Sequence, residues 1–409
     1  MCESSWSIVH VAKMSSLTSQ TSTSDLSKSW VHGAAFFSLL AALAPFGVNI
    51  AVGISPSFGE SSGMDAKTGA ATVALYALGL GLGQPFMGGA ADHWGRRKAM
   101  MWGLLLGSFG SICAAMASSD VQLLWARFIS GFGLSTCLVV PRVCLRDLHQ
   151  GAVLQRNMAK LSNVFAAMPV VTQPLAWALG YWFSWRVQLL ALVICVLLVI
   201  YISWRWQPET KAAGTVAPHW RVWLEVLQDA SILRTSLTFA GACAPFFVIA
   251  AIGPAAIEQS TGGGTGVIAA ILGITYLGFA FGNLWVRRHA AIASAVLIKQ
   301  GLWVVVLSMA LFVAALWISD LWIWSVALAV YAVGQGIVFP AGFSLVLEGR
   351  ALQAGVASAT IGTIHMTTGG AVAWVAGALP YSQDVSLVLT STVITFAAVV
   401  TWAWMKPTS

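Results

Sequence analysis

The stretch that decides the fold is Gly83–Lys98, which reads G-Q-P-F-M-G-G-A-A-D-H-W-G-R-R-K. It lies between two apolar runs, 68–90 and 99–117. Each run is long enough to cross a hydrocarbon core of about 30 Å as a helix that rises about 1.5 Å per residue. The stretch carries one carboxylate, Asp92, and ends in three cations, Arg96–Lys98. Because loops rich in Arg and Lys stay in the cytoplasm, the sequence predicts a tight turn at the cytoplasmic membrane surface.

The composition is that of a membrane protein. The 409 residues are 58% hydrophobic and only 9% charged, whereas soluble domains carry about 25% charged residues. The net charge of +7 does not indicate nucleic-acid binding, because the cations gather at the ends of apolar runs on one side. The six cysteines show no metal-ligand spacing, so we expect neither a metal site nor another cofactor.

Twelve apolar runs follow a Ser- and Thr-rich stretch (1–29) that contains neither a signal peptide nor a span, and that we expect to be a disordered cytoplasmic tail. Met14 in this tail is an alternative start. The runs cover approximately residues 31–54, 68–90, 99–117, 121–144, 158–183, 187–205, 232–257, 267–286, 295–318, 321–346, 352–379 and 385–405. The longest internal polar stretch divides them six and six. We therefore expect an N-terminal bundle (30–205), a cytoplasmic central loop (206–231) and a C-terminal bundle (232–409).

The cations fix the orientation of these runs. Of the 21 Lys and Arg residues, only Lys67 and Arg186 fall on the opposite side of the predicted spans, and Arg127 falls within one. This bias places both termini in the cytoplasm. The predicted fold is therefore an all-α membrane protein with 12 transmembrane helices in two six-helix bundles. Carriers built from two repeated halves bind their substrate near the midplane between the halves.

The first turn also carries a family resemblance. Gly88, Asp92, Gly95, Arg96 and Arg97 stand in the order G-x-x-x-D-x-x-G-R-R, which resembles the loop between helices 2 and 3 of the major facilitator superfamily. The resemblance implies the twelve-helix carrier fold and a gating role for these residues.

A second set of motifs resembles the Bcr/CflA-like branch of 12-helix drug:proton antiporters. The matching positions are Arg127, Gly131, Gly133, Arg146 and Asp147 in the fourth run, Gly334–Pro340 in the tenth, and Gly355–Ala359 in the eleventh. This branch implies proton-coupled efflux of drugs or amphipathic metabolites across a bacterial-type inner membrane.

The chain departs from that branch at an informative place. Where the branch often has an acid in helix 1, the stretch beginning at Pro45 places Asn49. An amide cannot exchange a proton near neutral pH. All fourteen acids fall in the tail, in loops or near the ends of runs, although cation carriers and proton relays usually need a carboxylate at mid-membrane.

Arg127 and His365 are the candidate substrate-binding or coupling residues. Arg127 lies about 10 Å below the outer surface, either reaching back to Asp120 or facing the cavity between the halves. His365 lies deep in the eleventh run and either carries a coupling proton or bonds a neighbouring helix. Three neutral polar residues, Asn49, Gln335 and Tyr76, either bridge helices or contact the substrate.

The predicted gate lies on the cytoplasmic side. The family resemblance places Asp92 beside the start of the eleventh run, where the exposed N–H groups of a helix stabilise a carboxylate. Asp92 could also pair with Arg142 or Arg146 at the end of the fourth run.

The sequence therefore predicts a monomeric secondary transporter for a small molecule, and no enzyme, because the runs contain no clustered catalytic groups. Efflux of drugs or amphipathic molecules, driven by protons, follows from the branch resemblance. The alternative is a carrier of an anionic metabolite, such as a polycarboxylate or a carboxylate siderophore, bound by Arg127. A non-transporting receptor on the same fold is the remote alternative. The substrate, the coupling ion, the direction of transport and the oligomeric state stay open at this point.

Overall fold

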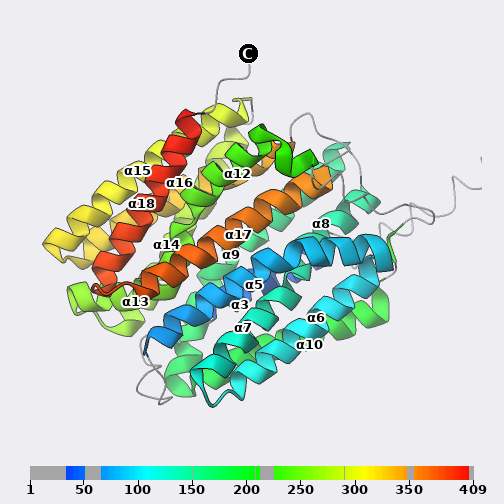
Figure 1. Ribbon diagram of the computed structural model, residues 1–409, viewed down its shortest axis with the longest axis horizontal. Coiled ribbons are helices and arrows are strands. Elements are labelled where there is room, and N and C mark those ends of the chain that lie inside the picture. Colours follow the sequence, from blue (N-terminus) through cyan, green and yellow to red (C-terminus); the bar gives the residue numbers. More distant parts are fainter. Residues whose placement is uncertain are drawn as a thin grey trace, which may run out of the picture.

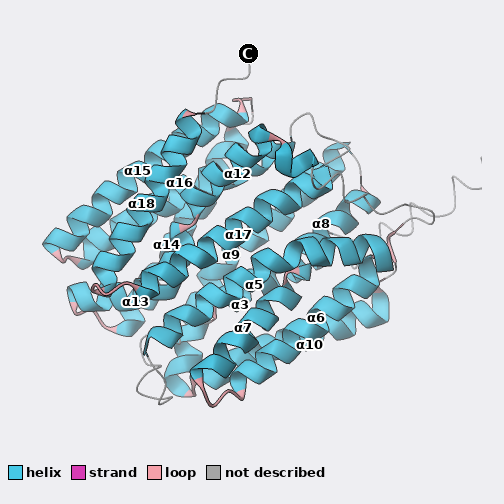
Figure 2. Cartoon of the chain, viewed as in Figure 1, coloured by secondary structure: helices cyan, strands magenta, loops and turns pink. Residues whose placement is uncertain are grey.

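The computed structural model describes residues 34–50, 66–149, 151–207, 209–211, 225–289, 291–347 and 354–404. Within these ranges the regular structure is helical, as Figure 2 shows. The first half contains α3 (Ala34–Asn49), α5 (Ala66–Trp94), α6 (Arg96–Ala115), α7 (Asp120–Leu134), α8 (Thr136–Leu148), α9 (Gly151–Trp182) and α10 (Trp185–Trp206). The second half contains α12 (Ala230–Cys243), α13 (Pro245–Thr261), α14 (Thr265–Arg288), α15 (Ser294–Ile318), α16 (Leu321–Leu347), α17 (Ala354–Ala378) and α18 (Gln383–Ala403).

Two pairs of these helices each continue as one apolar stretch, with a single residue at the junction. Ser135 separates α7 from α8, and Ala244 separates α12 from α13. Pro245 begins α13, where its missing N–H costs no hydrogen bond within the helix. Each pair forms one apolar stretch, Asp120–Leu148 and Ala230–Thr261.

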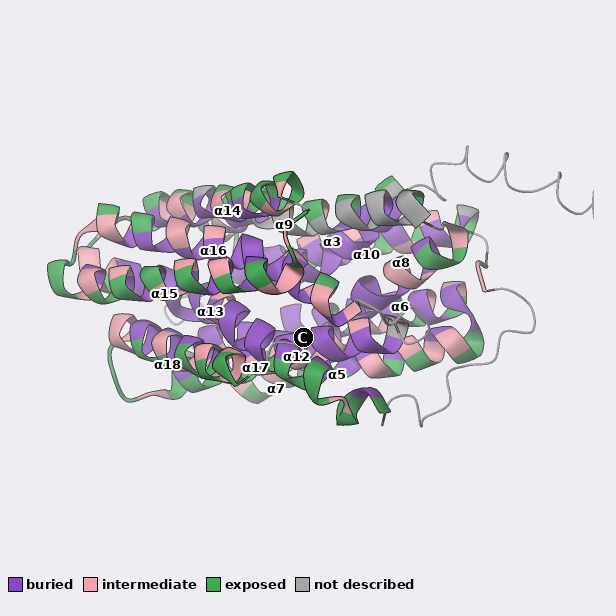
Figure 3. Ribbon diagram, turned by 90° about the horizontal axis from the view of Figure 1, so that it is seen from above, coloured by how far each residue is buried: buried purple, intermediate pink, exposed green. Residues whose placement is uncertain are grey.

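Nine helical stretches within the described residues are long and apolar enough to cross a membrane, counting each of these pairs once. The helix α3 is a shorter apolar helix, and α9 and α17 are not among the nine. Large apolar side chains are exposed on the outer faces, for example Trp102 at 63% and Trp317 at 84%, and Figure 3 shows exposed residues along the outside of α15. An apolar outer surface of this kind suits lipid rather than water.

The two halves meet where small residues let helices approach closely. Figure 1 shows α5 beside α17, and a methyl group added at Gly370 of α17 would lie 2.8 Å from the carbonyl oxygen of Ala74 in α5. On the other side of the molecule, Gly273 of α14 lies against Pro174 of α9. Glycine at helix contacts of membrane proteins has this effect in general.

The tight turn predicted after the second run is present, because α5 ends at Trp94 and α6 begins at Arg96. Gly95 between them has φ of 100°, a backbone conformation that L side chains rarely adopt. Gly95 is therefore required by the turn. Gly88 is not required in the same way, since a methyl group there would meet Val139 at 3.5 Å, an ordinary contact.

The predicted tail (1–29) and most of the predicted central loop (206–231) lie outside the described ranges. The helices on either side of that loop, α10 and α12, end at Trp206 and begin at Ala230. The domain boundaries placed there stay predictions.

Candidate functional site

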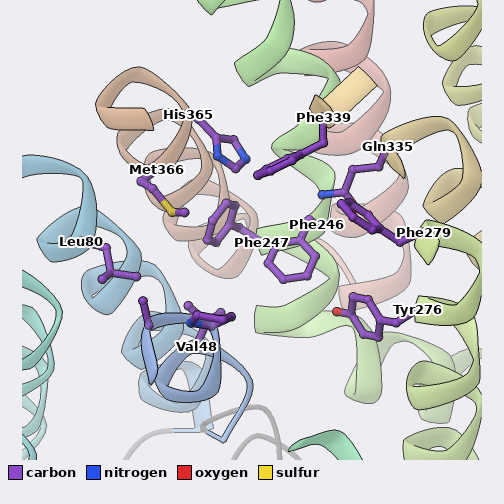
Figure 4. Close-up of a pocket in the computed structure, with 12 residues that line it drawn as sticks. Val48, Leu80, Phe246, Phe247, Tyr276, Phe279, Gln335, Phe339, His365 and Met366 are labelled. Carbon is purple, nitrogen blue, oxygen red and sulfur yellow. The ribbon is translucent and has the colours of Figure 1, made fainter. Parts of the chain in front are cut away.

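A cavity lies between the two halves, and the space between its lining atoms, which includes open solvent, is about 510 Å³. Figure 4 shows its wall, to which both halves contribute. The first half supplies Ala44, Pro45 and Val48 from α3 and Leu80 from α5. The second half supplies Phe246 and Phe247 from α13, Tyr276 and Phe279 from α14, Gln335 and Phe339 from α16, and His365 and Met366 from α17.

The aromatic part of this wall comes from the second half. The ring centroids of Phe246 and Phe247 are 5.1 Å apart at an interplanar angle of 84°, and those of Phe246 and Tyr276 are 5.8 Å apart at 75°. Phe279 and Phe339 meet at 5.7 Å and 63°. Edge-to-face contacts at these distances are favourable for aromatic rings, so they stabilise this part of the wall.

Two of the predicted site residues lie on this wall. Gln335 is 4% exposed and His365 is 3% exposed. The His365 ring is packed among Phe239, Phe247 and Phe339, with centroids 4.9, 5.4 and 5.9 Å away. Its Nε2 atom has no hydrogen-bond partner among the described residues. A buried polar atom without a partner is costly, so this atom is suited to bind something that enters the cavity.

Asn49 bridges helices rather than lining the cavity. Its Nδ2 atom donates to the Pro45 carbonyl at 2.7 Å, and its Oδ1 atom accepts from Gln173 Nε2 at 3.0 Å. Gln173 is in turn hydrogen-bonded to the Tyr276 side chain. This chain of hydrogen bonds joins α3 and α9 of the first half to α14 of the second half at one edge of the cavity.

Arg127 is fully buried inside the first half and does not contribute to the cavity wall. Its guanidinium donates to the Gly47 carbonyl at 2.8 Å and to the Thr72 carbonyl at 3.4 Å, and it lies over the Tyr76 ring at 4.2 Å. Neither expectation from the sequence describes this position, because the side chain neither faces the cavity nor is paired with Asp120. Arg127 instead donates to one carbonyl near the end of α3 and to one near the start of α5.

Tyr76 belongs to the same unit, because its hydroxyl donates to the Ala44 carbonyl of α3 at 3.2 Å. Gly47 leaves room for the Tyr76 ring, which a side chain at position 47 would displace. The Tyr76–Arg127 pair therefore positions α3, which carries Ala44, Pro45 and Val48 into the cavity wall.

The predicted pairing of Asp92 with Arg142 or Arg146 is not what the structure shows. Asp92 Oδ1 accepts from Arg96 Nη1 at 2.8 Å, and Arg96 Nε donates to Asp147 Oδ2 at 3.0 Å. Arg96 thus lies between two carboxylates, and its guanidinium has enough N–H donors to bind both at the same time. Residues 348–353, which precede α17, lie outside the described ranges. The predicted position of Asp92 beside the start of that helix therefore stays a prediction.

The two other predicted gate arginines have different surroundings. Arg146 is 44% exposed at the side chain and only reaches Asp147 at 4.0 Å. Arg142 of α8 lies over the Phe343 ring of α16, with 5.0 Å between the guanidinium carbon and the ring centroid. Phe343 follows Phe339 by one helical turn and packs against it at 5.4 Å. Arg142 therefore contacts the other half of the molecule on the side of the cavity nearer to Arg96.

Glu209 is a site residue that the sequence did not reveal. Its two carboxylate oxygens accept the backbone N–H groups of Arg96 and Arg97 at 2.8 and 3.1 Å, which caps the start of α6. Lys211 donates to the Asp92 carbonyl at 2.6 Å. These contacts attach the segment after α10 to the turn at Gly95, although Glu209 follows Arg96 by 113 residues in the sequence.

A repeat in the sequence would have pointed to the cavity. Residues 42–48 read A-L-A-P-F-G-V and residues 242–248 read A-C-A-P-F-F-V, an identical A-x-A-P-F-x-V pattern. Both segments supply cavity residues, Pro45 and Val48 from the first and Phe247 from the second. In both, a tyrosine hydroxyl donates to a carbonyl just before the proline: Tyr76 to Ala44, one residue before Pro45, and Tyr331 to Cys243 at 3.2 Å, two residues before Pro245.

Metal chemistry has no candidate here, since no group of three or more His, Cys, Asp or Glu in the described part of the chain could hold an ion.

Comparisons with known proteins agree with the fold. Residues 37–378 match the model of the Major Facilitator Superfamily. "Multidrug resistance protein D" of Escherichia coli is 26% identical over 80% of this chain and 84% of its own length. "Chloramphenicol resistance protein" of Pseudomonas aeruginosa is 26% identical over 59% of this chain, which spans only 55% of that relative. A crystal structure of a D-xylose-proton symporter has the same fold, with a TM-score of 0.73, 14% identity, and coverage of 91% of this chain and 97% of that one.

Proposed function

The chain belongs to the Major Facilitator Superfamily, and from that premise we propose that it is a secondary transporter that expels drug-like or other amphipathic small molecules by alternating access. Members of the superfamily are transporters that bind small molecules, so the prediction of a non-enzyme is confirmed. The observation that carries the proposal is the cavity between the halves, walled by α3 and α5 on one side and by α13, α14, α16 and α17 on the other.

The same proposal includes twelve membrane crossings. Adding α3, α9 and α17 to the nine apolar stretches makes twelve, and the 32 residues of α9 and the 25 of α17 are enough to span a bilayer. The excess of Lys and Arg at one end supports cytoplasmic termini in a bacterial inner membrane. Bundles at 30–205 and 232–409, joined by a cytoplasmic loop, complete this topology.

Efflux is the direction favoured by the relatives, since two of them are named for resistance to multiple drugs and to chloramphenicol. The anionic alternative rested on Arg127 facing the cavity, and the structure directs that side chain to the Gly47 and Thr72 carbonyls instead. No other observation favours a polycarboxylate or siderophore carrier.

Proton coupling is the finer part of the proposal, and His365 is its candidate residue. It is an ionisable group on the cavity wall at a depth where the sequence offers no carboxylate. An imidazole can take up and release a proton, which suits a coupling group. The rings of Phe239, Phe247 and Phe339 surround His365, and the charge of Arg142 acts on it electrostatically. A bound substrate and a protonated imidazole would therefore compete at this part of the wall.

Efflux can be tested in a bacterial strain that lacks its main drug exporters. Expression of the full chain should lower chloramphenicol accumulation, and a protonophore should restore it. Val48→Trp, which fills the cavity from α3, should remove this effect, whereas Leu39→Trp, on the same helix but 47% exposed, should keep it. Equal accumulation with and without the membrane-inserted chain would refute efflux of this drug.

A further inference from the structure

We propose that the cavity binds uncharged aromatic molecules that carry a hydrogen-bonding group, and that it rejects organic cations and carboxylates of the same size. The inference rests on the proposed transport function, because it takes this cavity as the substrate site. Its basis is the composition of the wall: none of the twelve described lining residues is Asp, Glu, Lys or Arg.

An organic cation would find no counter-charge in this cavity. The acids of the described cavity-lining helices, Asp92 of α5 and Glu258 of α13, lie near helix ends, and Asp92 is already paired with Arg96. Two guanidinium groups, Arg127 and Arg142, lie in the interhelical region, and neither is in an ion pair among the described residues. The positive charge of these two groups would repel an organic cation. The attraction of aromatic rings for a cation is smaller than the free-energy cost of burying that cation without a counter-charge.

A carboxylate would also lack a charged partner. Arg127 donates to backbone carbonyls and covers the Tyr76 ring, and Arg142 covers Phe343. Neither guanidinium belongs to the wall. A carboxylate would therefore be bound by uncharged hydrogen-bond donors alone. These donors do not offset the free-energy cost of removing water from a full negative charge.

The polar groups of the wall match a neutral ligand. The Gln335 amide offers one donor and one acceptor side, and the His365 Nε2 atom has no partner among the described residues. Figure 4 shows the two side chains on opposite sides of Phe339. Tyr276 is already engaged by Gln173, so Gln335 and His365 are the anchors. The surrounding rings of Phe246, Phe247 and Phe279 would pack on a flat aromatic skeleton.

The test compares three probes with one skeleton: 1-naphthylmethanol, 1-naphthylmethylammonium and 1-naphthoate. Binding of each radiolabelled probe to the purified full chain is measured by scintillation proximity. We expect the alcohol to bind at least about tenfold more tightly than either ion, a difference of about 1.4 kcal/mol. Tighter binding of the ammonium or of the naphthoate, or no binding of the alcohol up to about 1 mM, would overturn the proposal.

A charge placed in the wall provides the second arm. Gln335→Glu keeps the size of the side chain and should raise the affinity for the ammonium probe about tenfold relative to the alcohol, because it supplies the missing counter-charge. Gln300→Glu is the matched control, since Gln300 lies on α15 beside Trp285 and outside the cavity wall. If Gln335→Glu does not fold, Gln335→Leu replaces it and should weaken the alcohol but not naphthalene.

Transport of the same probes in proteoliposomes separates this inference from the function on which it rests. If the ammonium probe is carried best, the charge preference is wrong and the transporter proposal survives. If the alcohol binds with the predicted preference and no probe is carried, the binding site stands and the transport proposal fails.

Discussion

Replacing Arg96 by methionine should destabilise the first half of the molecule more than any other single change at the turn. Arg96 is 5% exposed, donates to Asp92, Asp147 and the Ala91 carbonyl, and is held at the backbone by Glu209. Methionine has a similar length and no charge, so it would leave two carboxylates facing each other without a cation. The two negative charges would repel each other, and in a partly buried site water hydrates them only incompletely.

The size of the effect follows from how exposed the two acids are. Removing one partner of a buried ion pair costs about 3–5 kcal/mol. The Asp92 and Asp147 side chains are 24% and 18% exposed, so water compensates part of the loss. We expect a loss of about 3 kcal/mol for Arg96→Met. Arg96→Lys keeps the charge but not the fork, so it should cost about 1–2 kcal/mol.

The assay is the apparent melting temperature of the purified chain in detergent, which should fall by about 5 °C or more for Arg96→Met. Arg97→Met is the matched control, because Arg97 is less buried and its guanidinium donates only to the Trp204 carbonyl among the recorded hydrogen bonds. Adding Asp92→Asn and Asp147→Asn to Arg96→Met should restore part of the loss. An Arg96→Met protein that melts like the wild type would refute the reasoning.

Two further predictions concern the contacts around the cavity. Asn49→Asp should lower stability by about 1–3 kcal/mol, because it replaces the Nδ2 donor to the Pro45 carbonyl by an acceptor; it should also make transport depend on pH on the acid side. A melting temperature and a pH–transport profile that both match the wild type would contradict this. Arg142→Gln and Phe343→Leu should each open the side of the cavity nearer to Arg96, and the two effects should not add, since the pair makes one contact. The readout is maleimide labelling of Met366→Cys in inside-out vesicles, with the exposed Arg146→Gln as control; labelling rates that simply multiply in the double variant would exclude the shared contact.

The sequence predicted the all-helical membrane class because the length and the apolar composition of a helix are local properties, whereas the count of twelve spans and the cytoplasmic termini stay predictions. A run such as 68–90 and the cations that follow it can be identified without knowing any contact. His365 and Gln335 were placed at a useful depth for the same reason, since depth follows from position within a run. Their place on the cavity wall agrees with the predicted binding role, which no observation here tests.

The direction of a side chain around its helix is not a local property, and there the sequence was insufficient. Depth alone did not show that Arg127 points to α3 rather than to the cavity, because Gly47 and Thr72, which supply its carbonyl partners, are 80 and 55 residues away. The same holds for Glu209, whose role depends on the N–H groups of Arg96 and Arg97 more than 100 residues earlier. An exposed glutamate after a helix carries no signal of such a contact.

The ion pairs at the turn also change where a gate between the halves should be sought. Asp92, Arg96 and Asp147 all belong to the first half, so their ion pairs stabilise that half rather than join it to the other. Among the described contacts, Arg142 on Phe343 does join the halves on that side of the cavity. A variant at Arg96 should therefore change stability first, and one at Arg142 should change the balance between open and closed states first.

The repeated A-P-F segments account for part of the difference between the two sides of the cavity. In the first half, Gly47 leaves room for the Tyr76 ring, and the Arg127 guanidinium lies over that ring. Position 47 in this half therefore serves to hold α3 in place. In the second half the corresponding position is Phe247, which lines the cavity directly. Since the first half contributes only Ala44, Pro45, Val48 and Leu80 to the wall, it offers a smooth surface with few distinguishing groups. Substrate choice should therefore change mainly through substitutions in α13, α14, α16 and α17, while substitutions at Tyr76 or Arg127 should act on all substrates alike.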